Sequence, residues 1–376
     1  MNKKQMGLLA SAGVLCLPSV VNAAGPSLSD VLVNSGIAVS GYLDSSYTEG
    51  FNKGSTLGGG NAGGRAFDVK SDSFTFNQAA LNIGYLPTEG FGGFVNVIAG
   101  DDAKVINGSY QGSTSGNDFA LTQAYVQYAT GNLTVIGGRY VTLAGFEVIN
   151  DTLNNNISRS LLFQNAEPLV HTGIRASYKF SDLITGYLGL NNSANTGLAS
   201  DDNKQKTLEA GAAVTPSKAI SLGAYEYYGF DNFGSSANPT QKTSFTDFVA
   251  SWQVIDPLQL AFNADYKKIY GVDGGPAGSE IYGFAGYVNY TILSNLKASL
   301  RGEYLKYKTD GASENNNEFT LTLDYSPAAN FDLLGEVRAD GSSSHIYPNG
   351  DGADLKGSES DIAIKAIYKF GTPTGS

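Results

Sequence analysis

The sequence predicts an all-β fold: one closed antiparallel transmembrane β-barrel of about 16 strands, with short periplasmic turns and long outer loops. Three observations predict it, namely an N-terminal export leader, segments in which polar and apolar residues alternate, and connections that are short and long in turn. The composition agrees, because 47 Gly, 22 Tyr and 19 Phe beside 11 Pro and 1 Trp favour strands and turns over helices.

The N-terminal segment predicts export. Met1 to Lys4 is basic, Met6 to Val21 is apolar, and Val21-Asn22-Ala23 supplies the small residues that a leader peptidase accepts. We expect a cleaved signal peptide over residues 1–23 and a short periplasmic segment over 24–36. The apolar run is shorter than the roughly 20 residues of a spanning helix. No later run is long enough either and the mean hydropathy is −0.14, so a membrane crossing must use strands.

Cysteine content and charge limit the chemistry. The only cysteine, Cys16, lies in the leader after the bulky Leu15, so lipid attachment, a disulfide and a thiolate centre are not expected in the mature chain. Loss of Lys3 and Lys4 with the leader takes the formal net charge from −11 to −13. That acidity argues against nucleic acid or anionic lipid bound through a basic patch, and it is typical of solvated acidic loops.

Alternation with a period of two marks the expected strands. Over residues 296–304 the apolar Leu, Ala, Leu, Gly and Tyr share one face, and the polar Lys, Ser, Arg and Glu share the other. The segments that alternate are 37–47, 74–86, 91–99, 119–129, 133–141, 171–180, 184–191, 206–215, 220–230, 243–254, 258–270, 280–291, 296–308, 317–325, 331–340 and 360–370. The pattern is less regular in 91–99 and 220–230, which suggests either a bulge or a different strand boundary there.

A soluble β-sandwich also alternates, so the decisive feature is the rhythm of the connections. Short turns are expected at 87–90, 130–132, 181–182, 216–218, 255–257, 293–295 and 326–330, and longer polar segments lie between them, such as 48–73, 100–118, 142–170 and 341–359. An outer-membrane barrel follows this rule because only its outer end carries long loops. We therefore expect the barrel to cover residues 37–370, embedded in outer-membrane lipid, and a tail to follow over 371–376.

Several stretches resemble the OmpL-like β-barrel porin family of Gram-negative bacteria. They include Ser40-Gly41-Tyr42-Leu43-Asp44, Gln123-Ala124-Tyr125-Val126, Gly138-Arg139-Tyr140 and Asn156-Ile157-Ser158-Arg159-Ser160. The resemblance covers nearly the whole mature chain, and its specific part is residues 40–175. It implies an outer-membrane channel for passive diffusion of small hydrophilic solutes and ions, without catalytic residues or a cofactor. The aromatic end of the last strand, at Phe370, resembles the signal that the barrel-assembly machinery reads.

The third long connection is the candidate constriction. In general porins, which this architecture resembles, the third outer loop folds inward and narrows the lumen. Opposed acidic and basic groups in such a passage create a transverse field that sorts solutes by charge. We predict that Glu147, Asp151, Arg159 and Glu167 lie near Arg139 and Arg175 of the wall, with His171 either at the pore rim or in a hydrogen-bonded structural role. A solvated outer loop with local ion pairs is the alternative.

The polar face of the strands supplies candidates for the lumen wall. Charged side chains facing lipid cost about 2–4 kcal/mol each at the midplane, so alternation fixes which face looks inward. The candidates carry both signs and leave the ion preference open; they are Asp265, Lys267, Lys297, Arg301, Glu303, Asp332, Glu336, Arg338 and Lys365.

Other functions find less support in the sequence. The only histidines, His171 and His345, do not stand in a hydrolase pattern, so no enzyme is expected. Residues 349–354 offer oxygen ligands and turns but no full calcium-loop register, and the Gly-rich residues 58–64 precede no helix pattern, so neither a metal nor a phosphate site is predicted. A non-conducting barrel for adhesion or surface display is the alternative function, and a homotrimer is expected only by analogy with general porins.

Overall fold

The computed structural model describes residues 35–54, 56–58, 64–110, 117–194, 204–231, 241–272, 277–350 and 354–372. The predicted signal peptide, most of segments 24–36 and 371–376, and most of the Gly-rich residues 58–64 lie outside the described residues. Within the described ranges, the structure has no helix of the length and apolarity that a membrane crossing requires.

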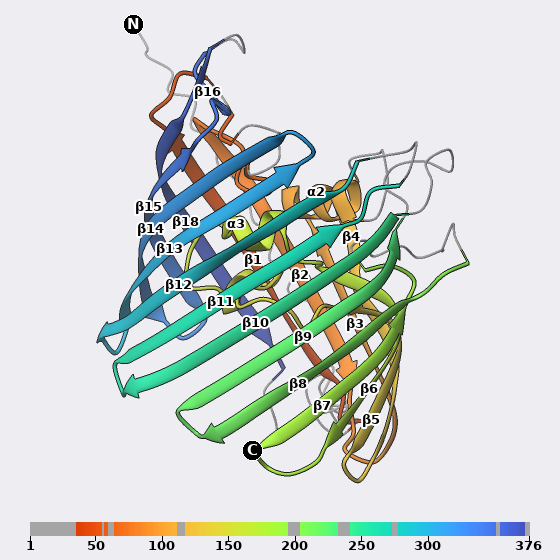
Figure 1. The fold of residues 1–376 in the computed structure, drawn as a ribbon. Helices are drawn as coiled ribbons and strands as arrows, with labels where there is room; N and C mark the ends of the chain where they lie inside the picture. Colours follow the sequence, from red (N-terminus) through yellow and green to blue (C-terminus); the bar gives the residue numbers. More distant parts are fainter. Residues whose placement is uncertain are drawn as a thin grey trace, which may run out of the picture.

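Sixteen strands close into one antiparallel barrel, as the alternation predicts (Figure 1). Each strand pairs with its neighbours in sequence, and the first and last strands close the ring with Tyr42 opposite Lys369. The strands are β1 (Ala38–Gly50), β2 (Ser73–Tyr85), β3 (Gly90–Ala99), β4 (Phe119–Thr130), β5 (Leu133–Val141), β6 (Val170–Lys179), β7 (Ile184–Asn191), β8 (Thr207–Ser217), β9 (Ile220–Asp231), β10 (Gln241–Ile255), β11 (Leu258–Ile269), β12 (Ser279–Leu293), β13 (Leu296–Thr309), β14 (Ala312–Ala328), β15 (Phe331–Ser342) and β18 (Ser358–Gly371).

The two ends of the barrel differ in their connections. Short turns join strands at one end, the turn end, and the longer segments emerge at the other, the loop end. The exception is β13 to β14, which meet at the loop end through Asp310 and Gly311 alone, with Gly311 at φ +85°. The expected connection at 309–316 is therefore wrong. Residues 312–316 continue β14, with Asn315 opposite Lys306, because a strand that rises above the membrane can be polar on both faces.

A register shift explains the irregular pattern in β3. Asn96 lies opposite Gln123, whereas the next residue, Val97, lies opposite Leu121. One extra residue in β4 thus changes which side chains face inward above and below this point, as a β-bulge does. The bulge suggested for residues 91–99 lies in this pair of strands.

The barrel wall is apolar outside and polar inside. On β18, Ile362 and Ile364 are 43% and 57% exposed, whereas the flanking Asp361 and Lys365 are only 2% and 3% exposed. This is the reverse of a soluble protein, in which charged side chains remain in water. The outer face is therefore built to contact hydrocarbon and the inner face to contact polar groups.

Segments from the loop end occupy the interior. Three of them contribute buried residues in their described parts: loop 1 (residues 51–72), loop 2 (100–118) with α2 (Asp101–Tyr110), and loop 3 (142–169) with η1 (Asp151–Leu153) and α3 (Leu161–Asn165). Figure 1 shows α3 inside the barrel, where it packs against β12 and β13. A small hairpin of β16 (Tyr347–Pro348) and β17 (Leu355–Lys356) lies at the loop end beyond β15.

Candidate functional site

Loop 3 leaves the wall after β5 and crosses the lumen toward β10 and β11. The Tyr227 hydroxyl, inside β9, accepts a hydrogen bond from the Leu143 amide at 3.0 Å and contacts Thr142 Oγ1 at 3.1 Å. The Phe146 amide donates to Asn263 Oδ1 of β11 at 2.6 Å. These bonds to two wall strands direct the loop inward rather than into solvent.

Capping residues determine where the two short helices of loop 3 begin. Asn150 accepts a hydrogen bond from the Thr152 amide and begins η1, and Ser160 accepts one from the Phe163 amide at 3.0 Å and begins α3. The Leu161 amide at the start of α3 donates to the carboxylate of Glu303 of β13, and its nitrogen lies 2.8 Å from each carboxylate oxygen. A wall carboxylate thus binds the positive end of the helix.

Ion pairs fix loop 3 to β13 and β15. Arg301 Nη1 donates to Glu147 Oε1 at 2.6 Å and to the Ser158 carbonyl at 2.8 Å. Glu336 accepts from the Ser158 amide at 3.0 Å, and Arg338 Nη1 donates to the Arg159 carbonyl at 2.7 Å. Charged wall groups therefore bind both amides and carbonyls of the loop backbone. Such charge-assisted hydrogen bonds are stronger than hydrogen bonds between neutral groups.

A second contact joins loop 3 to β18. Asp151 accepts from Lys365 Nζ at 2.7 Å and pairs within the loop with Arg159. All three side chains are at most 3% exposed. Because a buried charge is costly without a partner, this triad requires the loop and the wall to remain together.

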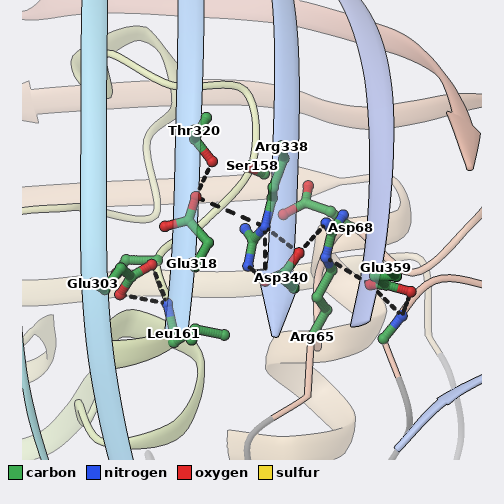
Figure 2. Close-up of polar contacts among 12 residues, drawn as sticks. Arg65, Asp68, Ser158, Leu161, Glu303, Glu318, Thr320, Arg338, Asp340 and Glu359 are labelled. Carbon is green, nitrogen blue, oxygen red and sulfur yellow. Dashed lines mark hydrogen bonds and ion pairs between the residues drawn. The ribbon is translucent and has the colours of Figure 1, made fainter. Parts of the chain in front are cut away.

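Loop 1 joins the same assembly through Arg65. Figure 2 shows its guanidinium between Asp340 and Glu359, at 2.6 and 3.3 Å, and it also pairs with Asp361. The three carboxylates belong to β15 and β18, and all four side chains are nearly inaccessible. Arg65 was not among the residues predicted from the sequence.

Loops 1 and 3 also contact each other directly. Phe67 and Phe163 pack with ring centroids 5.5 Å apart, and Asp68 accepts a hydrogen bond from the Arg159 amide at 2.9 Å. The side chain of Gln164 accepts from the Phe67 amide at 3.3 Å. We call residues 65–68 and 146–169 the inner loop assembly, a unit whose ion pairs to the wall are with β13, β15 and β18.

The structure corrects the partners expected for loop 3. Glu147 and Asp151 bind Arg301 and Lys365, on the opposite wall from the expected Arg139 and Arg175. Arg175 pairs with Glu209 of β8, and Arg139 is buried in β5. The expectation was wrong because proximity in sequence favoured the strands on either side of the loop, whereas the loop crosses the lumen.

Glu167 lies in a different, acidic environment. An added Cβ at Gly145 would stand 2.0 Å from Glu167 Oε2, and Gly145 has φ +90°, so this close approach requires glycine. Burial raises the pKa of Glu167 well above its usual value, and the charges of Asp265 and Asp247 raise it further. The carboxyl therefore favours its protonated form. Among the described residues no group of histidine, cysteine and acidic side chains has the arrangement of a metal site.

His171 is enclosed in the wall rather than open to the lumen. Its ring stacks on Tyr227 with centroids 4.6 Å apart and planes 8° from parallel, and its side chain is fully buried in β6. His171 Nδ1 lies 3.4 Å from the Ser193 carbonyl. The other histidine, His345, is exposed at the loop end.

The remaining wall candidates face inward from β11 to β18. Asp265, Lys267, Glu303 and Asp332 are at most 8% exposed, and Asp332 accepts from Lys369 Nζ at 2.6 Å. Lys297 differs, because it lies near the turn end in a cavity of about 210 Å³ that Asn155 of loop 3 also lines. The structure thus brings Arg301, Glu303, Glu336, Arg338 and Lys365 against loop 3 and leaves Lys297 and Asp332 near the turn end.

Some inward positions of the wall from β7 to β9 carry no side chain. Gly211 and Gly223 hold no side chain there, and an added Cβ on either would come within 2.4 and 2.8 Å of the Tyr225 ring. Tyr225 therefore lies flat against the wall, with Tyr187 6.0 Å away edge to face. A second open region, a cavity of about 400 Å³, lies between loop 3 and β1 to β5 and is lined by Tyr42, Phe94 and Leu153 among others.

Comparison with known sequences identifies one family. A family profile described as "Putative beta-barrel porin-2, OmpL-like" matches residues 36–370, nearly the whole chain. No curated protein sequence shows significant similarity.

Solved structures share the fold at low identity. The outer membrane channel DcaP of Acinetobacter baumannii is 15% identical, with a TM-score of 0.61 over 89% of this chain and 97% of that chain. OmpT of Vibrio cholerae, folded in vitro and described in a trimer form, is 13% identical with a TM-score of 0.61 over 89% and 99%. An anion-selective porin from Comamonas acidovorans is 11% identical with a TM-score of 0.56 over 89% and 99%.

Proposed function

Because the chain belongs to the OmpL-like beta-barrel porin-2 family, we propose that it forms a water-filled outer-membrane channel through which small hydrophilic solutes and ions diffuse passively. The observation that carries this proposal is the inverted wall. All six arginines of the sequence are buried, at most 7% exposed, while large apolar side chains are exposed on the outer face. Polar groups directed into an enclosed lumen are what a passage for hydrophilic solutes requires.

The two sides of the lumen differ in the residues that line them. The inner loop assembly occupies the side from β12 to β18, where its charges are neutralised in pairs. On the other side, Gly211 and Gly223 add no side chain to the inner face of β8 and β9, and the Tyr225 ring lies flat against them. We propose that solutes pass along β6 to β9, with loop 3 as the constriction and Arg175 and Glu209 as the nearest wall charges.

The non-conducting display barrel is the alternative function, and one observation favours it. Loop 1 folds against the inner wall together with loop 3, and both are held by buried ion pairs. Should that assembly close the lumen, the barrel would present its outer loops without conducting. An enzyme is not proposed, because His171 is sealed between Tyr227 and the wall and lacks access to a substrate.

Assembly and partners follow from the same proposal. We propose export through a cleaved leader, insertion by the barrel-assembly machinery and contact with outer-membrane lipid around the apolar belt. A homotrimer is proposed because a structure of the same fold, OmpT of Vibrio cholerae, is described in a trimer form.

Solute permeation into liposomes tests the proposal. Liposomes that contain the refolded chain should swell in isotonic solutions of small neutral sugars, at rates that fall as the sugar becomes larger. Protein-free liposomes and liposomes with heat-unfolded chain are the controls. No swelling with the smallest sugar, from a chain that keeps its heat-modifiable mobility in gels, would contradict the channel and support the display barrel.

A further inference from the structure

Four lysines lie together on the outer face of the barrel at its loop end. They are Lys242 of β10, Lys268 of β11, and Lys306 and Lys308 of β13, which we call the lysine patch. Their neighbours in sequence establish the face: Thr243, Lys267 and Leu305 are buried on the inner side, so the lysines point outward.

Strand register places these lysines next to one another. Lys268 lies opposite Glu280 of β12, which lies opposite Lys308. Tyr266 and Tyr282 similarly lie in one row with Lys306. Lys242 accepts, through its carbonyl, a hydrogen bond from the amide of Tyr270 at 2.9 Å. Since neighbouring strands are about 4.8 Å apart, the patch spans a width on the order of 15 Å.

The exposed aromatic side chains change from phenylalanine to tyrosine between the middle of the wall and the lysines. Nearer the middle of the wall, Phe262, Phe284 and Phe319 are 40 to 56% exposed. Tyrosines follow toward the loop end, among them Tyr228 and Tyr266, which are 40% and 39% exposed. Phenylalanine suits hydrocarbon and tyrosine suits the membrane interface, so the lysines stand at the level of lipid headgroups.

Aromatic rings position the ammonium groups. Lys242 Nζ lies 4.5 Å from the ring centroid of Tyr228, and Lys308 Nζ lies 5.1 Å from that of Tyr282. Only Lys268 has a carboxylate within ion-pair distance among the described residues, Glu280 at 2.8 Å. Lys242 and Lys308 also hydrogen-bond the side chains of Tyr228 and Tyr282. An ammonium has three donors, so each can still donate to an additional anion.

We propose that the lysine patch binds the phosphate groups of a phosphorylated glycolipid in the outer leaflet, whose acyl chains lie on the phenylalanines below. Charge complementarity favours this partner, because among the described side chains on the outward faces of β9 to β13 four lysines outnumber two carboxylates, Glu280 and Glu226, on a chain whose formal net charge is −11. A second copy docked face to face would oppose lysines to lysines, which is unfavourable. The inference does not depend on conductance.

Lipid retention measured by native mass spectrometry tests the proposal. The refolded chain in detergent is mixed with lipid A carrying two phosphates or with the same lipid without phosphate. The test variant replaces Lys242, Lys268, Lys306 and Lys308 with glutamine, and the matched control replaces the exposed Lys53, Lys179, Lys218 and Lys356. We expect the wild type and the control to retain the phosphorylated lipid and the test variant to bind it at least about tenfold more weakly, since the variant lacks the lysines that attract the anionic headgroup.

Two results would overturn the proposal. One is equal retention by the test variant and the wild type, and the other is equal retention of the two lipids, which would assign binding to acyl chains alone. A variant with arginine at the four positions should keep the affinity. If the fourfold glutamine variant does not fold, the Lys306→Gln, Lys308→Gln double variant gives the same comparison with a smaller expected loss.

Discussion

Arg301 of β13 and Glu147 of loop 3 form an ion pair with 2.6 Å between Nη1 and Oε1, although 154 residues separate them in sequence. Both side chains are at most 4% exposed. The same guanidinium binds Glu318 of β14, so one arginine joins two wall strands to the loop. The position of loop 3 is therefore coupled to the wall, and each group can be tested separately.

Removal of the arginine should cost more than removal of the glutamate. Arg301→Gln leaves Glu147 and Glu303 without their cation and leaves Glu318 with Arg338 alone, at 4.0 Å, and we expect a loss of about 3–5 kcal/mol in the free energy of unfolding. Glu147→Gln keeps Arg301 paired with Glu318 and should cost about 1–3 kcal/mol. Urea titration in lipid vesicles measures both. The double variant should cost less than the sum, and strict additivity would show that the pair is not coupled.

Loss of Arg65 should release loop 1 and widen the lumen. Arg65→Gln leaves Asp340, Glu359 and Asp361 facing one another without their shared cation, so we expect a loss of about 3–5 kcal/mol in stability and a larger single-channel conductance. Lys356→Gln, which removes an exposed charge at the loop end, is the control and should change neither value. An unchanged conductance for Arg65→Gln would separate loop 1 from the passage.

Glu167 should make the fold less stable as pH rises. Its folded pKa is raised by burial, then by Asp265 and Asp247, whereas the unfolded chain ionises near 4.5. The folded state thus keeps a proton that the unfolded state has lost, and stability falls from about pH 4.5 up to the folded pKa. Glu167→Gln removes this dependence, so its advantage over the wild type should grow with pH.

Asp182, a carboxyl at the turn end, should change stability with pH in the opposite direction to Glu167. The Lys179 ammonium lowers the pKa of the exposed Asp182, so Asp182→Asn should lose a little stability above the unfolded pKa of that group. Urea midpoints between pH 4 and 9 give both comparisons. A Glu167→Gln advantage that is constant over this range would contradict the buried, proton-favouring site.

Gly211 keeps Tyr225 against the wall. Gly211→Val would meet the ring and turn it into the lumen, so we expect a smaller conductance and a stability cost of about 1–3 kcal/mol. Adding Tyr225→Ala should restore the conductance. Gly286→Val, at an outward position with open space around it, is the control. Equal conductance in Gly211→Val and wild type would place the passage away from β8 and β9.

The barrel could be predicted from sequence because its signals are local. Alternation is set by the geometry of each strand, and the predicted segments 133–141 and 184–191 coincide with β5 and β7. The prediction of a connection at 309–316 was wrong because residues 314–317 are polar on both faces and show no alternation. They nevertheless pair in register with β13 and β15. Only the partner strands reveal such a segment.

The contacts of the inner loop assembly could not be predicted in the same way. Sequence pattern places Arg301 and Glu336 on the inner face but does not say which loop residue meets them, since the answer depends on how the chain crosses the lumen. Arg65 was missed because its Gly-rich surroundings carry no periodic pattern. One signal was available: the chain uses arginine only six times, and arginine is the residue preferred for buried ion pairs.

Single-channel recording of the wild type beside a variant that lacks residues 150–156 tests the central claim most directly. The deletion removes Asp151, which binds Lys365 and Arg159, and Asn156, which binds Thr322, so loop 3 should no longer reach β14 and β18. We predict discrete conductance steps for both proteins, larger in the variant and with altered ion selectivity. Steps of identical size and selectivity, or the absence of steps from both folded proteins, would contradict a passage bounded by loop 3.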